Sequence, residues 1–227
     1  MFNKRPPSVR VVPTWDISQV LMYPSKDHPP ADFSLFRLTA KVLFLLAAFT
    51  AKRVSDLVLF SVDSSLCHVT DECIVLQTQF GSKTDRPGHR SPPVTLRKCE
   101  EESLCPVRYV SAYKERTEPL RQASGTQQLF ISPFTQRPVK LATLRRWMVK
   151  VMREAGVIAS AGSTRATVTS CALLHDVPLQ QLLNSADWTR EDTPFRHYVR
   201  VLPERTLRSI SSQRSLQDAV LVQHERE

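Results

Sequence analysis

Two clusters of basic residues carry the excess positive charge of the sequence. Each contains a single acidic residue, and their local charges of +4 and +5 together match the formal net charge of +9 of the whole chain. Lys and Arg side chains gathered in this way attract a polyanion, because each neutralised phosphate releases counterions. Nucleic acid is the natural partner, although charge alone fits a solvated basic surface equally well. The basic residues are Lys83, Arg86, Arg90, Arg97 and Lys98 in the first cluster, and Lys140, Arg145, Arg146, Lys150, Arg153 and Arg165 in the second.

Cysteines are the other residues with chemistry of their own. The five are Cys67, Cys73, Cys99, Cys105 and Cys171. The first four form two pairs with five residues between the partners, and histidines lie nearby. Zinc-binding pairs are usually separated by about two to four residues, so zinc is a weak alternative and no metal site is predicted. The odd number argues against a closed set of disulfides.

A mainly helical domain must position these residues. From Asp32 onward, apolar residues recur at steps of three and four, which predicts a core helix with one buried stripe. These apolar residues are Leu35, Leu38, Val42, Leu45, Leu46 and Phe49. The same reasoning predicts further helices over residues 106–120, 141–155, 164–174, 178–184 and 193–200.

A small antiparallel hairpin is predicted within this helical order. Residues 73–79 alternate between apolar and polar types, and residues 94–96 read as extended. Glycines and prolines interrupt the segment between them, so the first basic cluster lies on a long loop. The predicted fold class is therefore mainly α with a small antiparallel β-sheet. We divide the chain into a Pro-rich basic lead-in (1–30), a main domain (31–202) and a C-terminal tail (203–227).

The distribution of apolar residues predicts neither a membrane protein nor a secreted one. The longest apolar run, residues 42–49, is far shorter than the roughly 20 residues that cross a bilayer. The first residues, MFNKRPPSVR, lack the apolar segment of a secretory signal. We therefore expect an intracellular protein in a reducing compartment.

Short strings in order along the chain resemble the motifs of the tyrosine recombinases. LLAAFTAKRVSDLVLFSVD resembles their first arginine box, with Arg53 after the core helix, and GSKTDRPG resembles the hairpin that carries their lysine, Lys83. STRATVTSCALLHDVPLQQLLNSADW resembles the second arginine box, with Arg165 and the later Trp188. FRHYVR resembles the segment of the nucleophile, Tyr198. The wording is closest to the recombinases of DIRS-like and Ngaro-like retrotransposons, and the match covers residues 15–200.

The resemblance implies a DNA strand-cleaving and rejoining transesterase with the tyrosine recombinase catalytic-domain fold over residues 31–202. Arg53 and Arg165 would clamp the attacked phosphate, because planar guanidiniums stabilise its extra negative charge. Tyr198 would form a 3′-phosphotyrosyl link, and Lys83 would protonate the departing 5′-oxygen as a general acid. Trp188 would donate its indole N–H to a phosphate oxygen or pack beneath the tyrosine. This chemistry requires no metal and no cofactor.

Each of these residues also has a plainer interpretation. The arginines could form structural ion pairs, the lysine could be an ordinary surface residue, and the tyrosine could be a packed ring. Asp56 is expected to orient neighbouring basic groups rather than to transfer protons. The residues expected to bind DNA outside the catalytic set are Arg86, Arg90, Arg145, Arg146 and Lys150.

The resemblance also implies partners. These are double-stranded DNA and further copies of the chain, in a tetramer on paired sites, in a nuclear or other intracellular location. No small-molecule substrate and no membrane are expected. The apolar residues of the tail that could dock on a neighbouring subunit are Leu216, Ala219, Val220 and Val222.

The second box departs from the family pattern at one position. The family has His three residues before the arginine, whereas this chain has Gly162. An imidazole there contributes a phosphate hydrogen bond and a candidate base, a kind of role worth about 10² to 10⁴ in rate. His197 adjoins Tyr198 but points about 100° away on a helix, and His89 is a looser substitute. Because few residues precede the predicted core helix, we expect this chain not to carry the helical DNA-binding domain that comes before the catalytic part of such recombinases.

Two rival functions therefore remain open. One is a catalytically silent DNA-binding module, degenerate or domesticated, that keeps the basic surface. The other is a topoisomerase-like enzyme that relaxes supercoils with the same tyrosine chemistry but without pairing sites.

Overall fold

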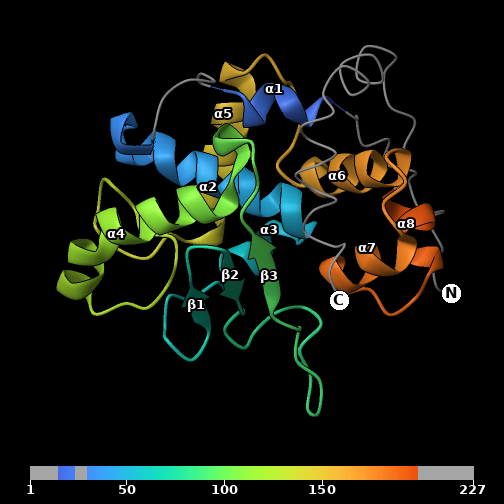
Figure 1. Ribbon diagram of the computed structural model, residues 1–227, viewed down its shortest axis with the longest axis horizontal. Helices are drawn as coiled ribbons and strands as arrows, with labels where there is room; N and C mark the ends of the chain where they lie inside the picture. The colour runs from blue at the N-terminus through green and yellow to red at the C-terminus, as the bar shows by residue number, and fades with distance from the viewer. Residues whose placement is uncertain (1–14, 24–29, 199–227) are drawn as a thin grey trace, which may run out of the picture.

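The computed structural model describes residues 15–23 and 30–198, and Figure 1 shows a small sheet along one side of a body of helices. The α-helices are α1 (Ile17–Leu21), α2 (Leu35–Thr50), α3 (Val54–Leu57), α4 (Pro106–Ser124), α5 (Leu141–Glu154), α6 (Ser163–Leu174), α7 (Leu179–Ala186) and α8 (Asp192–His197). The strands are β1 (Cys67–Val69), β2 (Cys73–Leu76) and β3 (Val94–Arg97). Short 3-10 turns cover η1 (Pro30–Asp32) and η2 (Glu102–Leu104). The predicted fold class, mainly α with a small antiparallel sheet, is confirmed.

The central element is α2, the helix that the apolar periodicity predicts. It begins after Ser34, whose hydroxyl accepts a hydrogen bond from the Arg37 N–H, and it ends at Ala51 in the left-handed conformation. The single buried stripe was wrong, because every residue from 38 to 47 is buried. A helix that is covered on all sides lies within the core, and α2 packs against α1, α3, α4, α5 and α6.

The sheet contains one more strand than predicted. Its order is β1-β2-β3, and both pairings are antiparallel. Cys73 pairs with Arg97 and Leu76 pairs with Val94, which confirms the predicted hairpin. The strand β1 was missed because three residues are too few to display an alternating pattern. Residues 77–93 form the long loop between β2 and β3, called here the lysine loop because it carries Lys83.

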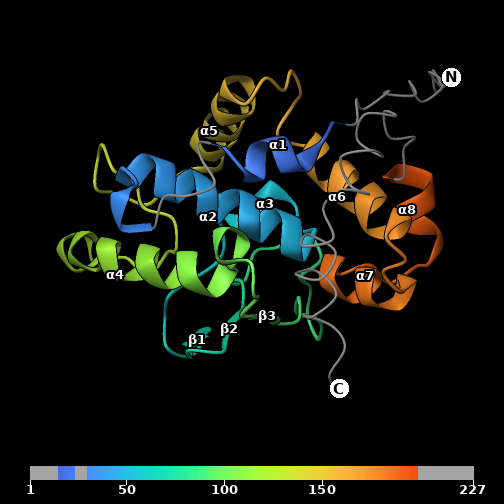
Figure 2. The same cartoon turned by 45° about the horizontal axis from the view of Figure 1, so that its top comes forward.

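The last helices form a separate group beside α2. Figures 1 and 2 both show α6, α7 and α8 on the same side of the molecule, with α4 on the opposite side of α2. Pro178 precedes α7 as its N-cap instead of occupying its first turn. The helix α8 ends at His197, so Tyr198 is its C-cap residue, and the rest of the predicted helix lies outside the described residues.

The N-terminal segment that contains Trp15 and α1 packs against the start of α6. Trp15 is buried, and its indole N–H donates to the Ser163 hydroxyl at 2.8 Å, which connects α1 to the start of α6. Lys41 of α2 donates to the carbonyl of Leu21 at the end of α1. None of the described helices has the length and apolar character to cross a membrane.

Candidate active site

Three residues of the recombinase-like strings meet at one point. The guanidinium carbon of Arg165, on α6, lies 4.5 Å from the centre of the Trp188 ring and 5.0 Å from the centre of the Tyr198 ring. The two rings lie 4.9 Å from each other. A guanidinium beside two aromatic rings gains cation–π attraction, so Arg165, Trp188 and Tyr198 form one cluster from three elements.

The backbone around the end of α7 positions the side chains of Arg165 and Trp188. Asp187, after α7, adopts the left-handed conformation with φ 54°, and the Trp188 N–H then donates to the Leu183 carbonyl at 2.9 Å. Arg165 donates from Nη2 to the Ala186 carbonyl at 2.7 Å. The first bond closes the turn after α7, and the second fastens α6 to the end of α7. The positions of Arg165 and Trp188 therefore depend on each other.

The cluster presents buried donors that have no acceptor among the described residues. They are Nε and Nη1 of Arg165 and the indole N–H of Trp188. A buried N–H without a partner costs about 1–3 kcal/mol, so in a native protein such a group calls for a partner such as a bound ligand, an ion or water. Three donors, two of them on a cation, suit an anion with several oxygens, such as a phosphate.

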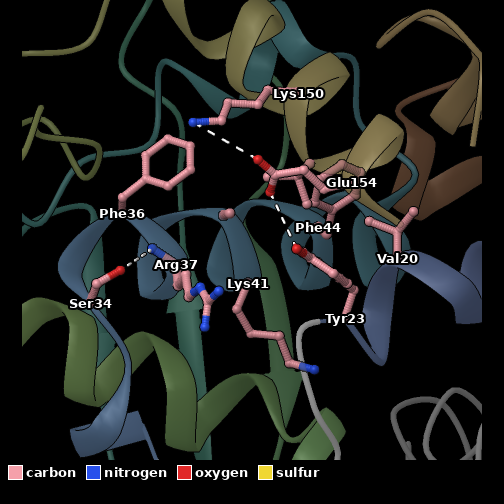
Figure 3. Close-up of a pocket in the computed structure, with 11 residues that line it drawn as sticks. Val20, Tyr23, Ser34, Phe36, Arg37, Lys41, Phe44, Lys150 and Glu154 are labelled. Carbon is pink, nitrogen blue, oxygen red and sulfur yellow. Dashed lines mark hydrogen bonds and ion pairs between the residues drawn. The ribbon is translucent and has the colours of Figure 1, made fainter. Parts of the chain in front are cut away.

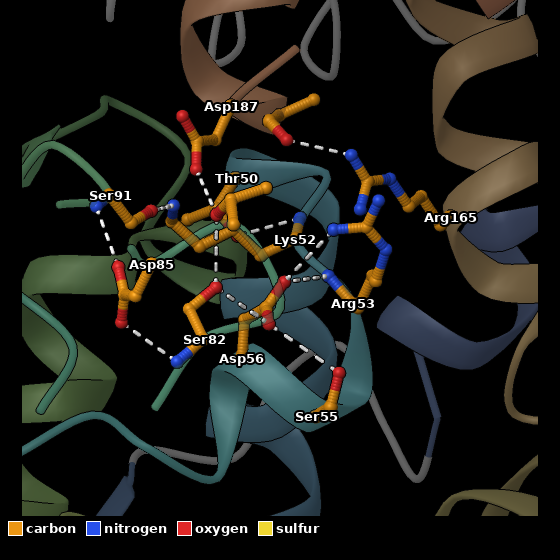
Figure 4. Close-up of polar contacts among 12 residues, drawn as sticks. Thr50, Lys52, Arg53, Ser55, Asp56, Ser82, Asp85, Ser91, Arg165 and Asp187 are labelled. Atoms are coloured by element: carbon orange, nitrogen blue, oxygen red, sulfur yellow. Dashed lines mark hydrogen bonds and ion pairs between the residues drawn. The ribbon is translucent and has the colours of Figure 1, made fainter. Parts of the chain in front are cut away.

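Arg53 brings a second guanidinium to the cluster. Figure 4 shows its side chain extending toward Arg165. Burial and then the positive charge of Arg53 lower the pKa of Arg165 to about 10, which leaves it protonated at neutral pH. Two cations held this close repel each other, and a bound anion would relieve that repulsion.

Asp56 orients Arg53 from the first turn of α3. Its Oδ2 accepts from the Arg53 backbone N–H at 3.3 Å and lies 3.7 Å from the Arg53 guanidinium. Asp56 is buried, whereas the Arg53 side chain is 28% exposed. The carboxylate therefore holds Arg53 at both its backbone N–H and its guanidinium, and part of the side chain still faces solvent.

The lysine loop runs along the edge of this cluster and exposes Lys83. Asp85 organises the loop, because its carboxylate accepts from the backbone N–H groups of Gly81, Ser82 and Ser91 at 2.8–3.0 Å. Burial opposes ionisation of Asp85, but these N–H groups outweigh it and lower the pKa of Asp85. Lys83 is thus an exposed side chain on a defined turn.

Lys52 is a buried cation that sequence reasoning missed. It is 4% exposed, and its Nζ donates to the Ser91 hydroxyl at 2.9 Å. Figure 4 shows it among Asp56, Asp85 and Asp187. Burial is the largest influence on Lys52 and lowers its pKa. In a sequence, a lysine next to an arginine is normally interpreted as a surface residue. The only sequence feature that could have indicated a buried Lys52 is its position directly after the core helix.

The other basic residues lie in two separate regions. Arg86 and Arg90 are exposed on the lysine loop, where Arg90 donates to the Thr78 carbonyl at 2.8 Å. Arg145, Arg146 and Lys150 are exposed on α5, and both ribbon views place α5 across α2 from the sheet. The structure therefore does not gather these five residues into one patch.

The histidine substitutes differ in position. His89 lies with its Nε2 3.8 Å from the Asp187 carboxylate, at the rim of a cleft of about 620 Å³ that Lys52, Arg90 and Trp188 also line. The side chain of His197 lies outside the described part of the structure. Gly162 is exposed and precedes α6 with helical φ of −70°, so nothing in its backbone requires glycine. Within the described residues, no three His, Cys, Asp or Glu side chains are grouped so as to hold a metal ion.

Comparison with known proteins establishes the fold. No model of a protein family matches the chain, and no curated protein sequence matches it. The chain is similar to the crystal structure of XerA recombinase, with a TM-score of 0.59 and 16% identity over 94% of this chain and 67% of that one. It is also similar to XerH site-specific recombinase bound to difH substrate in a pre-cleavage complex, with a TM-score of 0.60 and 13% identity over 88% of this chain.

A post-cleavage complex of XerH with palindromic difH substrate gives a TM-score of 0.61 at 12% identity. The chain spans about half the length of the XerH chains, 53% and 52% in the two complexes. At these identities the likeness concerns the fold, which is that of a tyrosine recombinase catalytic domain.

Proposed function

We propose that this chain is a DNA-binding tyrosine recombinase domain that breaks and rejoins DNA through Tyr198. The observation that carries the proposal is the group of three buried, unpartnered N–H donors of Arg165 and Trp188, with the Tyr198 ring 5.0 Å from the Arg165 guanidinium carbon. These donors suit the oxygens of a phosphate, and the nearness of the Tyr198 ring supports its phenol as the group that attacks the phosphorus. The DNA-bound XerH complexes with the same fold support DNA as the partner.

The proposed reaction is a transesterification. The Tyr198 oxygen forms a bond to phosphorus, the bond from phosphorus to the 5′-oxygen breaks, and the phenolic proton leaves to solvent or a nearby base. Lys83 gives a proton to the departing 5′-oxygen, while Arg53 and Arg165 hold the non-bridging oxygens. Attack by a 5′-hydroxyl on the phosphotyrosine reverses these steps, so the bond is conserved and no cofactor is consumed.

The residues of the two arginine boxes support a more specific proposal about the type of recombinase. The strings around Arg53 and Arg165 resemble those of DIRS-like and Ngaro-like retrotransposon recombinases. By that resemblance we propose action in the nucleus, on paired sites, in a tetramer whose neighbouring subunits receive the C-terminal tail.

A second candidate is a catalytically silent DNA-binding module, and Gly162 is the observation that favours it. The position offers no imidazole to the phosphate, whereas the guanidinium pair and the basic loop remain. Such a module would bind DNA through the same donors and form no covalent link.

A trapping assay separates these functions. The protein is incubated with a pool of nicked duplexes whose cleaved strand diffuses away, then denatured and examined for DNA attached to protein. A recombinase forms an adduct that is absent in Tyr198→Phe and falls by about 10² to 10³-fold in Arg165→Ala. Salt-sensitive DNA binding without an adduct identifies the silent module, and the absence of both refutes the proposal. Relaxation of supercoiled DNA that contains no paired sites would identify the topoisomerase-like enzyme.

A further inference from the structure

The segment around Lys83 is fastened on both sides to other parts of the candidate site. The residue before the lysine, Ser82, donates from its hydroxyl to Asp56 Oδ1 at 3.2 Å. The residue after it, Thr84, donates from its hydroxyl to Asp187 Oδ2. Asp56 belongs to the segment of Arg53, and Asp187 immediately precedes Trp188. The lysine therefore projects from a turn held between the two halves of the phosphate site.

Asp187 makes contacts that none of the recombinase-like motifs accounts for. It adopts φ 54°, a left-handed conformation that is uncommon for residues other than glycine, although Asp and Asn adopt it more often than most. Its side chain is 11% exposed and meets three groups from other elements. Thr84 donates a hydrogen bond to the Asp187 carboxylate, and His89 Nε2 lies 3.8 Å from that carboxylate. Among the acidic residues near Lys52, Asp187 has the largest electrostatic effect on the pKa of Lys52.

We propose that Asp187 is a positioning residue that fixes the lysine loop against the turn that carries Trp188. The inference rests on the proposed function, because it assigns Asp187 the task of holding Lys83 within reach of the leaving oxygen. A residue that holds a general acid in position affects the rate only through geometry. A displacement of the general acid by about 1 Å can lower the rate about 10²-fold. Asp187 touches no reacting atom in this scheme.

The chain offers a matched control for the backbone. Asp176, after α6, has φ 56° but an exposed side chain. A change to glycine relieves the same left-handed backbone at both positions, whereas only Asp187→Gly removes the contact with Thr84. Thr84→Val removes that contact from the other side and keeps the shape of the side chain.

The first measurement is the rate at which trypsin cuts after Lys83 in the intact folded protein. We expect Asp187→Gly and Thr84→Val each to raise this rate about tenfold, because a charge-assisted hydrogen bond no longer opposes local opening of the loop. The double variant should exceed neither single variant by much, and Asp176→Gly should match the unaltered protein. An unchanged rate in Asp187→Gly overturns the proposal.

The second measurement separates positioning of the lysine from general damage. A strand with sulfur in place of the bridging 5′-oxygen has a leaving group that needs no general acid. We expect Asp187→Gly to slow adduct formation about 10²-fold on the ordinary strand and to leave the sulfur strand close to normal, as Lys83→Ala should. Equal slowing on both strands overturns the proposal. If the unaltered protein forms no adduct on either strand, the proposed cleavage fails instead, and the trypsin result still decides whether Asp187 holds the loop.

Discussion

The guanidinium carbon of Arg165 lies 4.5 Å from the centre of the Trp188 ring, and both side chains are buried. The ring therefore stabilises a charge that burial would otherwise penalise, by about 0.5–2 kcal/mol. Its own indole N–H, like Nε and Nη1 of Arg165, is buried and has no acceptor among the described residues. Packing and hydrogen bonding by Trp188 are thus separable, and a substitution can remove one of them alone.

Trp188→Phe keeps an aromatic ring beside Arg165 and removes the N–H. We expect the variant to fold, because the lost N–H has no partner among the described residues and the loss of stability is limited to that of a smaller buried ring. Adduct formation should fall by about 10- to 10³-fold if the indole binds a phosphate oxygen in the transition state. Trp147→Phe, in the aromatic group with Phe36 and Phe134, is the control. Unaltered trapping by Trp188→Phe would assign Trp188 to packing alone.

DNA binding should weaken with salt in proportion to the phosphates that the protein neutralises. A plot of log affinity against log salt concentration is expected to be linear between about 50 and 200 mM, and Arg146→Ala should reduce its slope by about 1. Lys150→Ala should have less effect, because Lys150 already lies 3.9 Å from Glu154. Arg108→Ala, which breaks an ion pair between Arg108 of α4 and Glu102 of η2, is the control. A flat salt response would contradict a DNA-binding surface of any kind.

Local patterns predict the fold where the decisive interactions are local. The core helix α2 follows from its apolar spacing, and α5 ends before Gly156, as predicted. The predicted end of α4 was too early, since the helix continues through Pro119 to Ser124. Arg121 supports this extension by donating to the carbonyls of Gln128 and Leu129, a tertiary contact that no local pattern reports.

In the candidate site too, some residues could be predicted from the sequence and others could not. Arg165, Trp188 and Tyr198 belong to strings whose residue types are recognisable in sequence, and the structure brings them together. Thr84 and Asp187 are ordinary loop residues in sequence, and they meet only because the lysine loop folds onto the end of α7. Buried polar contacts between distant loops depend on the whole fold, so spacing along the chain does not reveal them.

Lys41 should make stability depend on pH in the alkaline range. It is buried beneath α1, extends away from the Tyr23–Glu154 pair in Figure 3, and lies 5.2 Å from the Tyr109 ring centre. Burial lowers its pKa from 10.5 to about 8, with partial opposition from Glu101. Between these two values the folded protein has released a proton that the unfolded chain still holds, so this residue makes stability rise as the pH rises.

The expected rise is at most about 3 kcal/mol, at about 1.36 kcal/mol per pKa unit. Urea unfolding should be measured at about pH 7.5 and about pH 10, near the two ends of this range. The stability should rise less, or fall more, for Lys41→Met than for the unaltered protein. Lys150→Met, at an exposed lysine, should follow the unaltered protein. Identical pH dependence in Lys41→Met and the unaltered protein would show that Lys41 stays protonated throughout the range.

Gly162→His decides whether the missing imidazole alone limits cleavage. Gly162 has φ −70° and is exposed, and a Cβ added there would meet only the Ser160 hydroxyl, at 3.9 Å. The backbone therefore accepts a side chain without strain, and the variant should fold as stably as the unaltered protein. If the rest of the site is intact, adduct formation should rise by about 10² to 10⁴-fold, with loss of the gain in the double variant with Tyr198→Phe. Gly162→Gln, which adds a polar side chain that cannot act as a base, should give a much smaller gain. An adduct that stays undetectable in Gly162→His, with DNA binding preserved, would mean that the site has lost more than the histidine and would favour the silent module.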